Sequence, residues 1–279
     1  NLRAYKASEH QISFMWFADY SSSHSMGIRF LGLPDSLDIC SLWGGIPSDI
    51  EGKPNTFYNP QVHEEMRFIQ KVKGVKLTYV TFPGVSGLDW VMSKPTAEER
   101  IQVYVYNNDL DGMDLDYEIH GDWMHGANFV KLIEYLGQHI GPKGKDPSKL
   151  LIVDGWPIDG GYEYLSYFIS QAYTCTGASN LQSRYDEVAT YGLPPERYIV
   201  TENMGDYYAN GGVAFTEADG NTVSGLGGRL YSLEGMARWN PTQGKKGGFG
   251  AFYAHRDYNS TPPYKYFRLG IQLQNPAVK

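Results

Sequence analysis

Short runs of apolar residues, each about the length of a β-strand, recur along the whole chain. Two examples are VKLTYVTF (residues 75–82) and LLIVDGW (residues 150–156), which contain few charges. Apolar runs of this length that are bounded by turn residues are typical of strands. The pattern predicts eight strands, at residues 12–20, 37–44, 75–82, 112–118, 150–156, 167–173, 197–204 and 247–255.

Segments with helical spacing of apolar residues lie between most of these strands. A strand followed by a helix, repeated about eight times, predicts a (β/α)8 TIM barrel, and no linker divides residues 1–279 into further domains. A doubly wound sheet is the alternative, but the segment after the first strand carries no Gly-rich phosphate loop. The expected helices are residues 59–72, 96–107, 125–140, 181–192, 227–239 and 264–273.

Composition and charge exclude some classes of function. The formal net charge is −7, and no block of Lys and Arg occurs, so we expect no nucleic-acid partner. No apolar run reaches 18 residues, so no membrane span is expected. Cys40 and Cys175 lie in apolar runs and are predicted to be buried thiols. The chain starts at Asn1 without an apolar signal segment, from which we expect a processed or trimmed form.

The stretch DLDGMDLDYE (residues 109–118) combines acidic and apolar residues in alternation. On a strand, Asp114, Asp116 and Glu118 would face one side, whereas Asp111 is out of phase with them. Crowded, buried carboxyl groups raise the pKa of at least one member, which is how an acid able to protonate a leaving group is made. Glu118 would reach the carboxyl end of the strand, where the active sites of such barrels lie.

Three other interpretations of this stretch are possible. A calcium loop of the EF-hand type needs a Gly at its sixth position and a Glu at its twelfth, and this sequence has neither there. A divalent-metal cluster of carboxylates is chemically possible, but no His stands at ligand spacing, and we expect no metal. A solvated acidic face is disfavoured by the interleaved Leu110, Met113 and Leu115.

The motif DGMDLDYE (residues 111–118) resembles the DxxDxDxE signature of glycoside hydrolase family 18, which includes chitinases and endo-β-N-acetylglucosaminidases. The resemblance implies a (β/α)8 barrel with the motif on the fourth strand. It also implies that Glu118 is the general acid and base, that Asp116 orients the substrate's 2-acetamido group, and that Asp114 holds Asp116 through a shared proton. Asp111 would support the strand. This family uses a substrate-assisted mechanism.

Polar and aromatic residues at the ends of later strands extend the expected site. Gln171 and Tyr173 form a Gln-x-Tyr pair that looks like the endo-β-N-acetylglucosaminidase version of the family, with Tyr173 bonding the acetamido carbonyl. A polar layer lining the barrel, without a catalytic role, is the alternative. Hydrogen bonds to sugar hydroxyls, or a place in the pocket wall, are expected of four further residues: Glu202, Asn203, Tyr253 and His255.

Two departures from the chitinase pattern affect the choice of substrate. The third predicted strand, VKLTYVTFPG, lacks the Ser-x-Gly-Gly motif, and the last strand offers Tyr253 where chitinases place a Trp. Four aromatic residues at strand ends would either stack on sugars or pack in the core. They are Trp43, Phe82, Trp90 and Trp156, of which Trp43 is our candidate for substrate binding.

These features favour an endo-β-N-acetylglucosaminidase that cuts between the two core GlcNAc residues of an N-glycan. A chitinase is the alternative within the family, and an inactive carbohydrate-binding relative is the alternative outside enzymes. No cofactor is expected, because proton transfer and the substrate's own acetamide carry the chemistry. From the resemblance we also expect a monomer that is secreted, periplasmic or attached to the cell surface.

Overall fold

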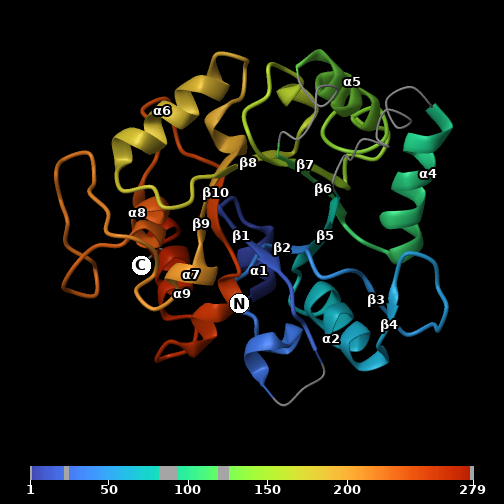
Figure 1. The fold of residues 1–279 in the computed structure, drawn as a ribbon, viewed down its shortest axis with the longest axis horizontal. Helices are drawn as coiled ribbons and strands as arrows, with labels where there is room; N and C mark the ends of the chain where they lie inside the picture. Colours follow the sequence, from blue (N-terminus) through green and yellow to red (C-terminus); the bar gives the residue numbers. More distant parts are fainter. Residues whose placement is uncertain (1, 22–24, 82–93, 119–125, 277–279) are drawn as a thin grey trace.

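The fold is a closed barrel of eight parallel strands, so the predicted fold class is confirmed (Figure 1). The computed structural model describes residues 2–21, 25–81, 94–118 and 126–276, without the side chains of residues 94–97. Around the barrel the strands follow the order β1, β10, β9, β8, β7, β6, β5 and β2. Their bounds are β1 Ile12–Phe17, β2 Ile39–Leu42, β5 Lys76–Thr81, β6 Gly112–Tyr117, β7 Leu150–Gly155, β8 Tyr167–Gln171, β9 Tyr198–Asn203 and β10 Gly248–Phe252.

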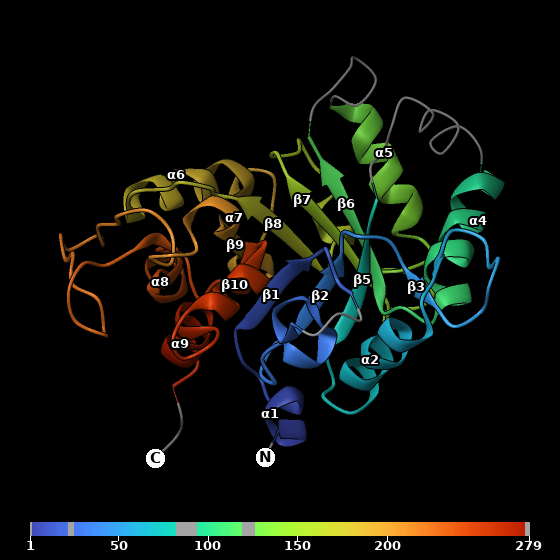
Figure 2. The same cartoon turned by 60° about the horizontal axis from the view of Figure 1, so that its bottom comes forward.

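Helices surround the strands on the outside, and each of the six predicted helices is present with shifted ends (Figures 1 and 2). Sequence signals explain where α2 begins: Asn59 accepts a hydrogen bond from the Val62 amide at 3.2 Å, and Pro60 occupies the first turn. The bounds are α2 Pro60–Lys71, α4 Lys94–Tyr104, α5 Ala127–Leu136, α6 Ala178–Ala189, α8 Ser232–Arg238 and α9 Lys265–Gln274.

Some elements were not predicted from the sequence. Two short helices are α1 (Leu2–Ala7) and α7 (Met204–Tyr207), and two two-residue strands, β3 (Pro47–Ser48) and β4 (Phe57–Tyr58), pair beside the barrel. Their apolar patterns are too short to show a period. Two connections carry 3-10 turns in place of a crossover helix: η1 (Met26–Ile28) and η2 (Phe30–Gly32) lie between β1 and β2, and η6 (Tyr162–Tyr164) lies between β7 and β8.

Alternation along the strands creates two apolar layers. The outer layer lies between strands and helices, and it contains Cys40 and Cys175 as buried free thiols. The inner layer fills the barrel itself, and the polar residues described below lie above it. It is made of Phe14, Trp16, Ile39, Val80, Ile152, Ile169 and Ile199.

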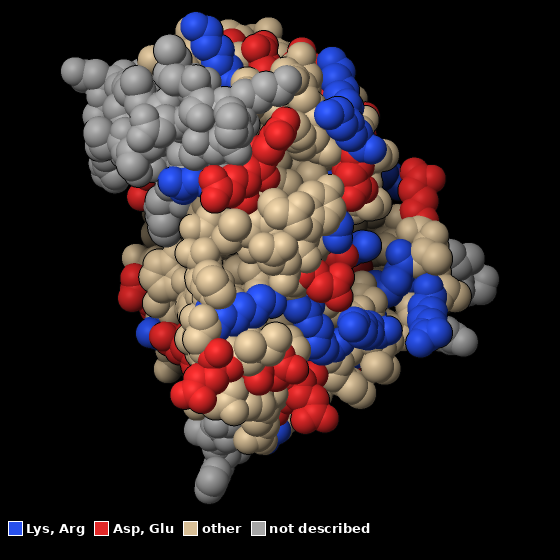
Figure 3. All heavy atoms as spheres, turned by 90° about the vertical axis from the view of Figure 1, so that its right-hand side faces the viewer, with Lys and Arg blue, Asp and Glu red and all other residues tan. Residues whose placement is uncertain are grey.

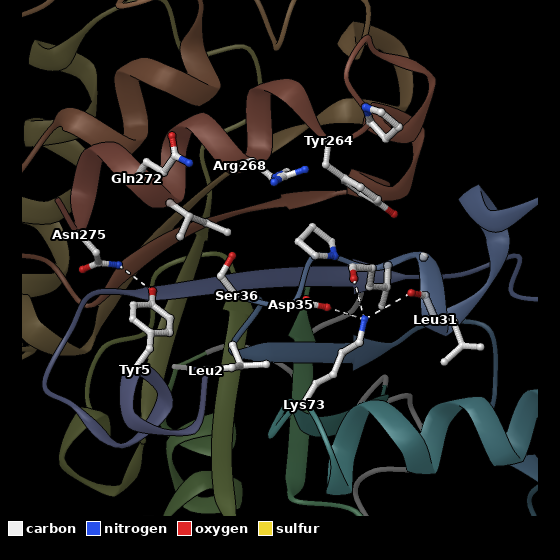
Figure 4. A pocket seen from close by; sticks show the side chains of 15 residues that line it. Leu2, Tyr5, Leu31, Asp35, Ser36, Lys73, Tyr264, Arg268, Gln272 and Asn275 are labelled. Carbon is white, nitrogen blue, oxygen red and sulfur yellow. Dashed lines mark hydrogen bonds and ion pairs between the residues drawn. The ribbon is translucent and has the colours of Figure 1, made fainter. Parts of the chain in front are cut away.

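A hollow of about 690 Å³ opens at the end of the barrel where the strands begin (Figure 4). It lies between α1, α9 and the chain before β2. Lys73 reaches into it and forms an ion pair with Asp35 at 2.7 Å, and Asn275 donates to the Tyr5 hydroxyl at 3.2 Å. In TIM barrels this end usually contributes to stability, whereas the active site lies at the opposite end.

Charged side chains of both signs are interspersed over the face of the molecule that lies on the right of Figure 1 (Figure 3). This face therefore carries no broad basic surface of the kind that follows a phosphate backbone. Among the described residues, no helix is both long enough and apolar enough to cross a membrane.

Candidate active site

The acidic motif lies on β6, and its members take different positions along the barrel. Asp114 and Asp116 face the interior with 0% and 9% exposure, and Glu118 is exposed just beyond the end of the strand. Gly112 starts the row, where a Cβ atom would lie 2.2 Å from the Leu150 carbonyl oxygen. The strand therefore presents acids from the barrel interior up to its mouth.

Asp114 is held by two donors from strands that lie two and three positions from β6 around the barrel. Its Oδ2 atom accepts hydrogen bonds from Trp16 Nε1 at 2.9 Å and from Ser41 Oγ at 2.7 Å. Trp16 is on β1 and Ser41 is on β2, so the side chain is fixed from two directions. Donors of this kind favour the ionised form of a carboxyl group.

A fourth acid, Asp154, joins the row from the neighbouring strand β7. It pairs with Asp116 in the strand register, and it is 1% exposed. Asp154 was not among the residues predicted from the sequence. The available signal was a lone acid in the apolar run LLIVDGW, at the same strand parity as the inward-facing Ile152.

Gln171, at the end of β8, points into this acidic cluster. Its Nε2 atom donates to Asp154 Oδ1 at 2.7 Å and lies 3.4 Å from Asp116 Oδ1. The Gln171 amide thus links two carboxyl groups from two strands. We call Asp114, Asp116 and Asp154, together with Gln171, the carboxyl cluster.

Burial and mutual repulsion shift the pKa values within the carboxyl cluster. Burial, followed by the charges of Glu118 and Asp114, raises the pKa of Asp116 to about 7. Burial also raises the pKa of Asp114, and burial together with the neighbouring acids raises that of Asp154. At neutral pH the cluster consequently retains protons that exposed carboxyl groups would have lost.

Tyr173 lies next to the carboxyl cluster, two residues beyond Gln171. Burial, and then the charges of Asp154 and Asp116, raise the pKa of its phenol well above the ordinary value. The hydroxyl therefore stays protonated and is a hydrogen-bond donor at every working pH. Its ring stacks on Phe252 with the centroids 6.2 Å apart.

Aromatic rings form one wall of the barrel mouth. Phe252, at the end of β10, contacts Trp16 inside the barrel and Trp43 above it, with ring centroids 6.4 and 5.5 Å apart. Trp43 is 40% exposed and meets the Tyr253 ring at 5.8 Å. Tyr253 was the aromatic residue predicted for this strand, but strand parity makes Phe252 its inward-facing ring.

Glu202 is placed differently from the expectation that it binds sugar. It is 0% exposed, and strand parity turns it away from the barrel interior into the outer layer. Its oxygens accept hydrogen bonds from the Thr174 amide at 2.9 Å, from the Asn203 amide at 2.7 Å and from the Ser232 hydroxyl. This carboxylate fixes the chain that follows Tyr173 and is not available to a ligand.

Two further residues named from the sequence also make internal contacts. Asn203 caps α7, accepting from the Gly205 amide at 2.8 Å. His255, expected in the pocket wall, is 5% exposed and packs its ring against Phe17 and Tyr253. Burial lowers the pKa of His255 to about 4, so it is neutral at physiological pH.

Asp111 lies at the opposite end of β6 from Glu118. It accepts hydrogen bonds from the Leu77 amide and from Gln70 Nε2, both at 2.9 Å. These contacts tie β6 to β5 and to α2. They hold the strand that carries the other acids.

Of the candidate sugar-stacking residues, Trp43 and Trp156 are described. Trp156 is 57% exposed and borders a hollow of about 370 Å³ that also contains Gln171 and Arg184. Phe82 and Trp90 lie outside the described residues. No group of three or more His, Cys, Asp or Glu is arranged to hold a metal ion in the described parts of the chain.

A parallel barrel in which acids on two neighbouring strands lead up to the mouth is typical of α/β-barrel glycosidases. Residues 13–251 match the family model of the endo-β-N-acetylglucosaminidase EndoS TIM-barrel domain. The chain belongs to this family, within glycoside hydrolase family 18.

Named relatives agree with this assignment. The chain is 27% identical over 208 residues to endo-β-N-acetylglucosaminidase EndoS of Streptococcus pyogenes serotype M1, covering 62% of this chain but only 21% of that protein. It is 27% identical over 308 residues to endo-β-N-acetylglucosaminidase F2 of Elizabethkingia meningoseptica, covering 99% of this chain and 85% of that protein.

Solved structures show the same fold. The apo endo-β-N-acetylglucosaminidase from Cordyceps militaris superposes with a TM-score of 0.65 at 21% identity, over 99% of this chain and 94% of the other.

Proposed function

We propose that this protein is an endo-acting glycosidase that hydrolyses the β-1,4 bond between the two core GlcNAc residues of N-glycans. The observation that carries the proposal is the row Asp114, Asp116 and Glu118, which rises to the barrel mouth with Gln171 and Tyr173 beside it. The names of the relatives EndoS and F2 support the same substrate class.

In the first step, the exposed Glu118 carboxyl group protonates the glycosidic oxygen, and the bond to the leaving sugar breaks. The carbonyl oxygen of the substrate's own 2-acetamido group attacks the anomeric carbon and forms an oxazolinium ring. Asp116 accepts a hydrogen bond from the acetamido N–H and stabilises the positive charge that develops on the oxazolinium ring. The Tyr173 hydroxyl donates to the acetamido oxygen and holds it in line for attack.

In the second step, the ionised Glu118 takes a proton from a water molecule, and the oxygen of that water bonds to the anomeric carbon. The oxazolinium ring opens, the acetamide is regenerated, and the product keeps the configuration of the substrate. Each group used in the first step returns to its starting protonation state.

The aromatic wall suits the apolar faces of sugar rings. Trp43 is half exposed next to Phe252 and Tyr253, and flat rings of this kind stack on pyranose faces.

We also propose that residues 1–279 form a single catalytic domain that acts as a monomer. N-glycans are carried by secreted and cell-surface proteins, so we propose a location outside the cytoplasm.

Intact-mass spectrometry of a high-mannose and a complex N-glycoprotein, incubated with wild type and with Glu118→Gln, tests the proposal. Wild type should remove the glycan and leave one GlcNAc on Asn, and the variant should be at least about 10²-fold slower. Glu163→Gln is the matched control, because Glu163 is also exposed but lies on η6. It should behave as wild type.

The other outcomes identify the alternatives. Unchanged glycoproteins with shortened chitin oligomers would make the protein a chitinase. Binding of either glycan by calorimetry, without turnover of any, would make it a carbohydrate-binding protein. Full turnover by Glu118→Gln would remove Glu118 from the acid role.

A further inference from the structure

Two oxygen atoms inside the carboxyl cluster have no donor among the described residues. They are Asp114 Oδ1 and Asp154 Oδ2, and both are fully shielded from solvent. The other oxygen of each group is occupied: Asp114 Oδ2 accepts from Trp16 and Ser41, and Asp154 Oδ1 accepts from Gln171. A buried carboxylate oxygen without a donor is costly, so these two atoms need an explanation.

A single proton held between the two carboxyl groups satisfies both atoms. Asp114 and Asp154 are on adjacent, paired strands, both unpartnered oxygens lie in the carboxyl cluster, and the charge of Asp114 is among the causes that raise the pKa of Asp154. Two ionised carboxylates next to each other in a buried site repel each other strongly, whereas a protonated acid can donate a strong hydrogen bond to an ionised one. The pair then carries one negative charge in place of two.

We infer that Asp154 is a positioning residue of the active site: it shares a proton with Asp114 and acts on the reaction through Asp116. The inference deepens the proposed function and rests on it for its catalytic consequence. The DxxDxDxE motif on β6 contains no such partner, because Asp154 comes from β7.

Asp116 is the group through which Asp154 acts. Asp154 and Asp116 both accept from Gln171 Nε2, and they are partners in the strand register, so the three side chains are held together. In the part of the chain that the structure describes, the charged and titratable groups that face Asp154 are Asp114 and Asp116 from β6 and Tyr173 after β8. With one proton on the Asp114 and Asp154 pair, Asp116 can ionise and accept the acetamido N–H without three charges meeting in one buried site.

Infrared spectroscopy of the resting protein tests the shared proton without any substrate. At pH 8 the wild type should show the C=O band of a protonated carboxyl group, shifted in ²H₂O. Asp154→Asn should lose one such band, and Asp111→Asn, an acid before the same strand but outside the cluster, should keep it. A band that survives in Asp154→Asn would overturn the inference whatever the protein's activity is.

Kinetics tests the catalytic consequence. Asn resembles a protonated Asp: it can accept from Gln171 and donate to Asp114. Asp154→Asn should therefore keep kcat within about tenfold of wild type, and Asp154→Ala, which offers neither bond, should lose about 100-fold or more. Circular dichroism establishes that both variants fold.

A loss in Asp154→Asn as large as that in Glu118→Gln would mean that the proton has to leave Asp154 during turnover, and equal activity of the Asn and Ala variants would mean that Asp154 positions nothing. Either result overturns the inference. If the wild type itself shows no turnover, the proposed function fails while the infrared result still decides the shared proton.

Discussion

Trp16 donates its indole N–H to Asp114 Oδ2 over 2.9 Å, so a residue of the apolar inner layer holds the first inward acid of β6. The same indole packs edge-on against Phe14 at 4.7 Å and faces Phe252 at 6.4 Å. One side chain thus connects the packing inside the barrel with the position of the acid row.

A double-mutant cycle measures this bond. Trp16→Phe keeps an aromatic ring and removes the donor, and Asp114→Ala removes the acceptor. Because hydrogen bonds to charged groups contribute about 1.5 to 3 kcal/mol, we expect a coupling free energy in that range from urea denaturation. Effects that add within about 0.5 kcal/mol would show that the bond contributes nothing.

The raised pKa of Asp116 makes the stability of the protein depend on pH. The pKa is about 7 in the folded state against an ordinary 3.8, so between these values the folded chain holds a proton that the unfolded chain has released. This proton's favourable contribution to the free energy of unfolding is complete below about pH 4. It is lost as pH rises towards 7, with a slope of up to about 1.4 kcal/mol per pH unit.

Asp116→Asn removes this titration. Chemical denaturation of wild type and variant at several pH values should therefore give a stability difference that grows in favour of the variant from pH 4 to pH 7. Parallel curves over that range would contradict a raised Asp116 pKa. The same variant should be inactive, because an amide cannot take the role of the ionised carboxylate.

The strands and most helices were predictable because their signals are local. Apolar runs such as residues 75–82 and 150–156 are typical of strands that are buried on both faces. Turn residues such as Asn59 and Pro60 indicate where a helix starts. The strands end earlier than predicted: the last strand, predicted to extend to residue 255, ends at Phe252. From there Tyr253 adopts a left-handed backbone conformation and starts a 3-10 turn.

The site was predictable only as far as one strand carries it. Asp114, Asp116 and Glu118 share a face of β6, and spacing alone shows this. Asp154 joins them through strand pairing, which no spacing within one segment reveals. Glu202 was predicted to bind sugar from its position at a strand end, but Ile199 faces inward, so a residue three positions further on faces outward.

Glu202 supports the segment that carries Tyr173, and its three hydrogen bonds predict different effects for two substitutions. Oε1 accepts from the Thr174 and Asn203 amides, and Oε2 from the Ser232 hydroxyl. In Glu202→Gln the amide oxygen can replace Oε1, and the NH₂ group can donate to Ser232. Glu202→Ala leaves three buried donors without an acceptor.

We expect Glu202→Gln to stay within about 1 kcal/mol of wild type and Glu202→Ala to lose on the order of 3 kcal/mol in urea denaturation. The Ala variant should also have a lower kcat, because the chain after Tyr173 is released. If instead both variants bind substrate more weakly while keeping wild-type stability, Glu202 contacts the sugar and our assignment is wrong.

At the other end of the barrel, Asp38 holds α1 and the start of β1. Its carboxylate accepts from the Ser13 amide at 2.9 Å, from His10 Nε2 at 3.0 Å and from Lys6 Nζ at 3.1 Å. Burial would raise the pKa of Asp38, but the His10 hydrogen bond and the Lys6 charge outweigh it and lower the pKa. The hydrogen bond to Asp38 raises the pKa of His10.

The two shifts define the pH range in which this contact is strongest. The contribution of Asp38 to the free energy of unfolding is present above its ordinary pKa of 3.8 and is lost as pH falls through its lower pKa in the folded state. The contribution of His10 is present below its ordinary 6.5 and is lost as pH rises through its higher folded value. Asp38→Asn should therefore cost about 3 kcal/mol near pH 5.5 and less near pH 8, by denaturation at both pH values.

Because these residues lie at the end of the barrel away from the carboxyl cluster, kcat of the folded variant should equal that of wild type. A fall in kcat with unchanged stability would contradict a purely structural role.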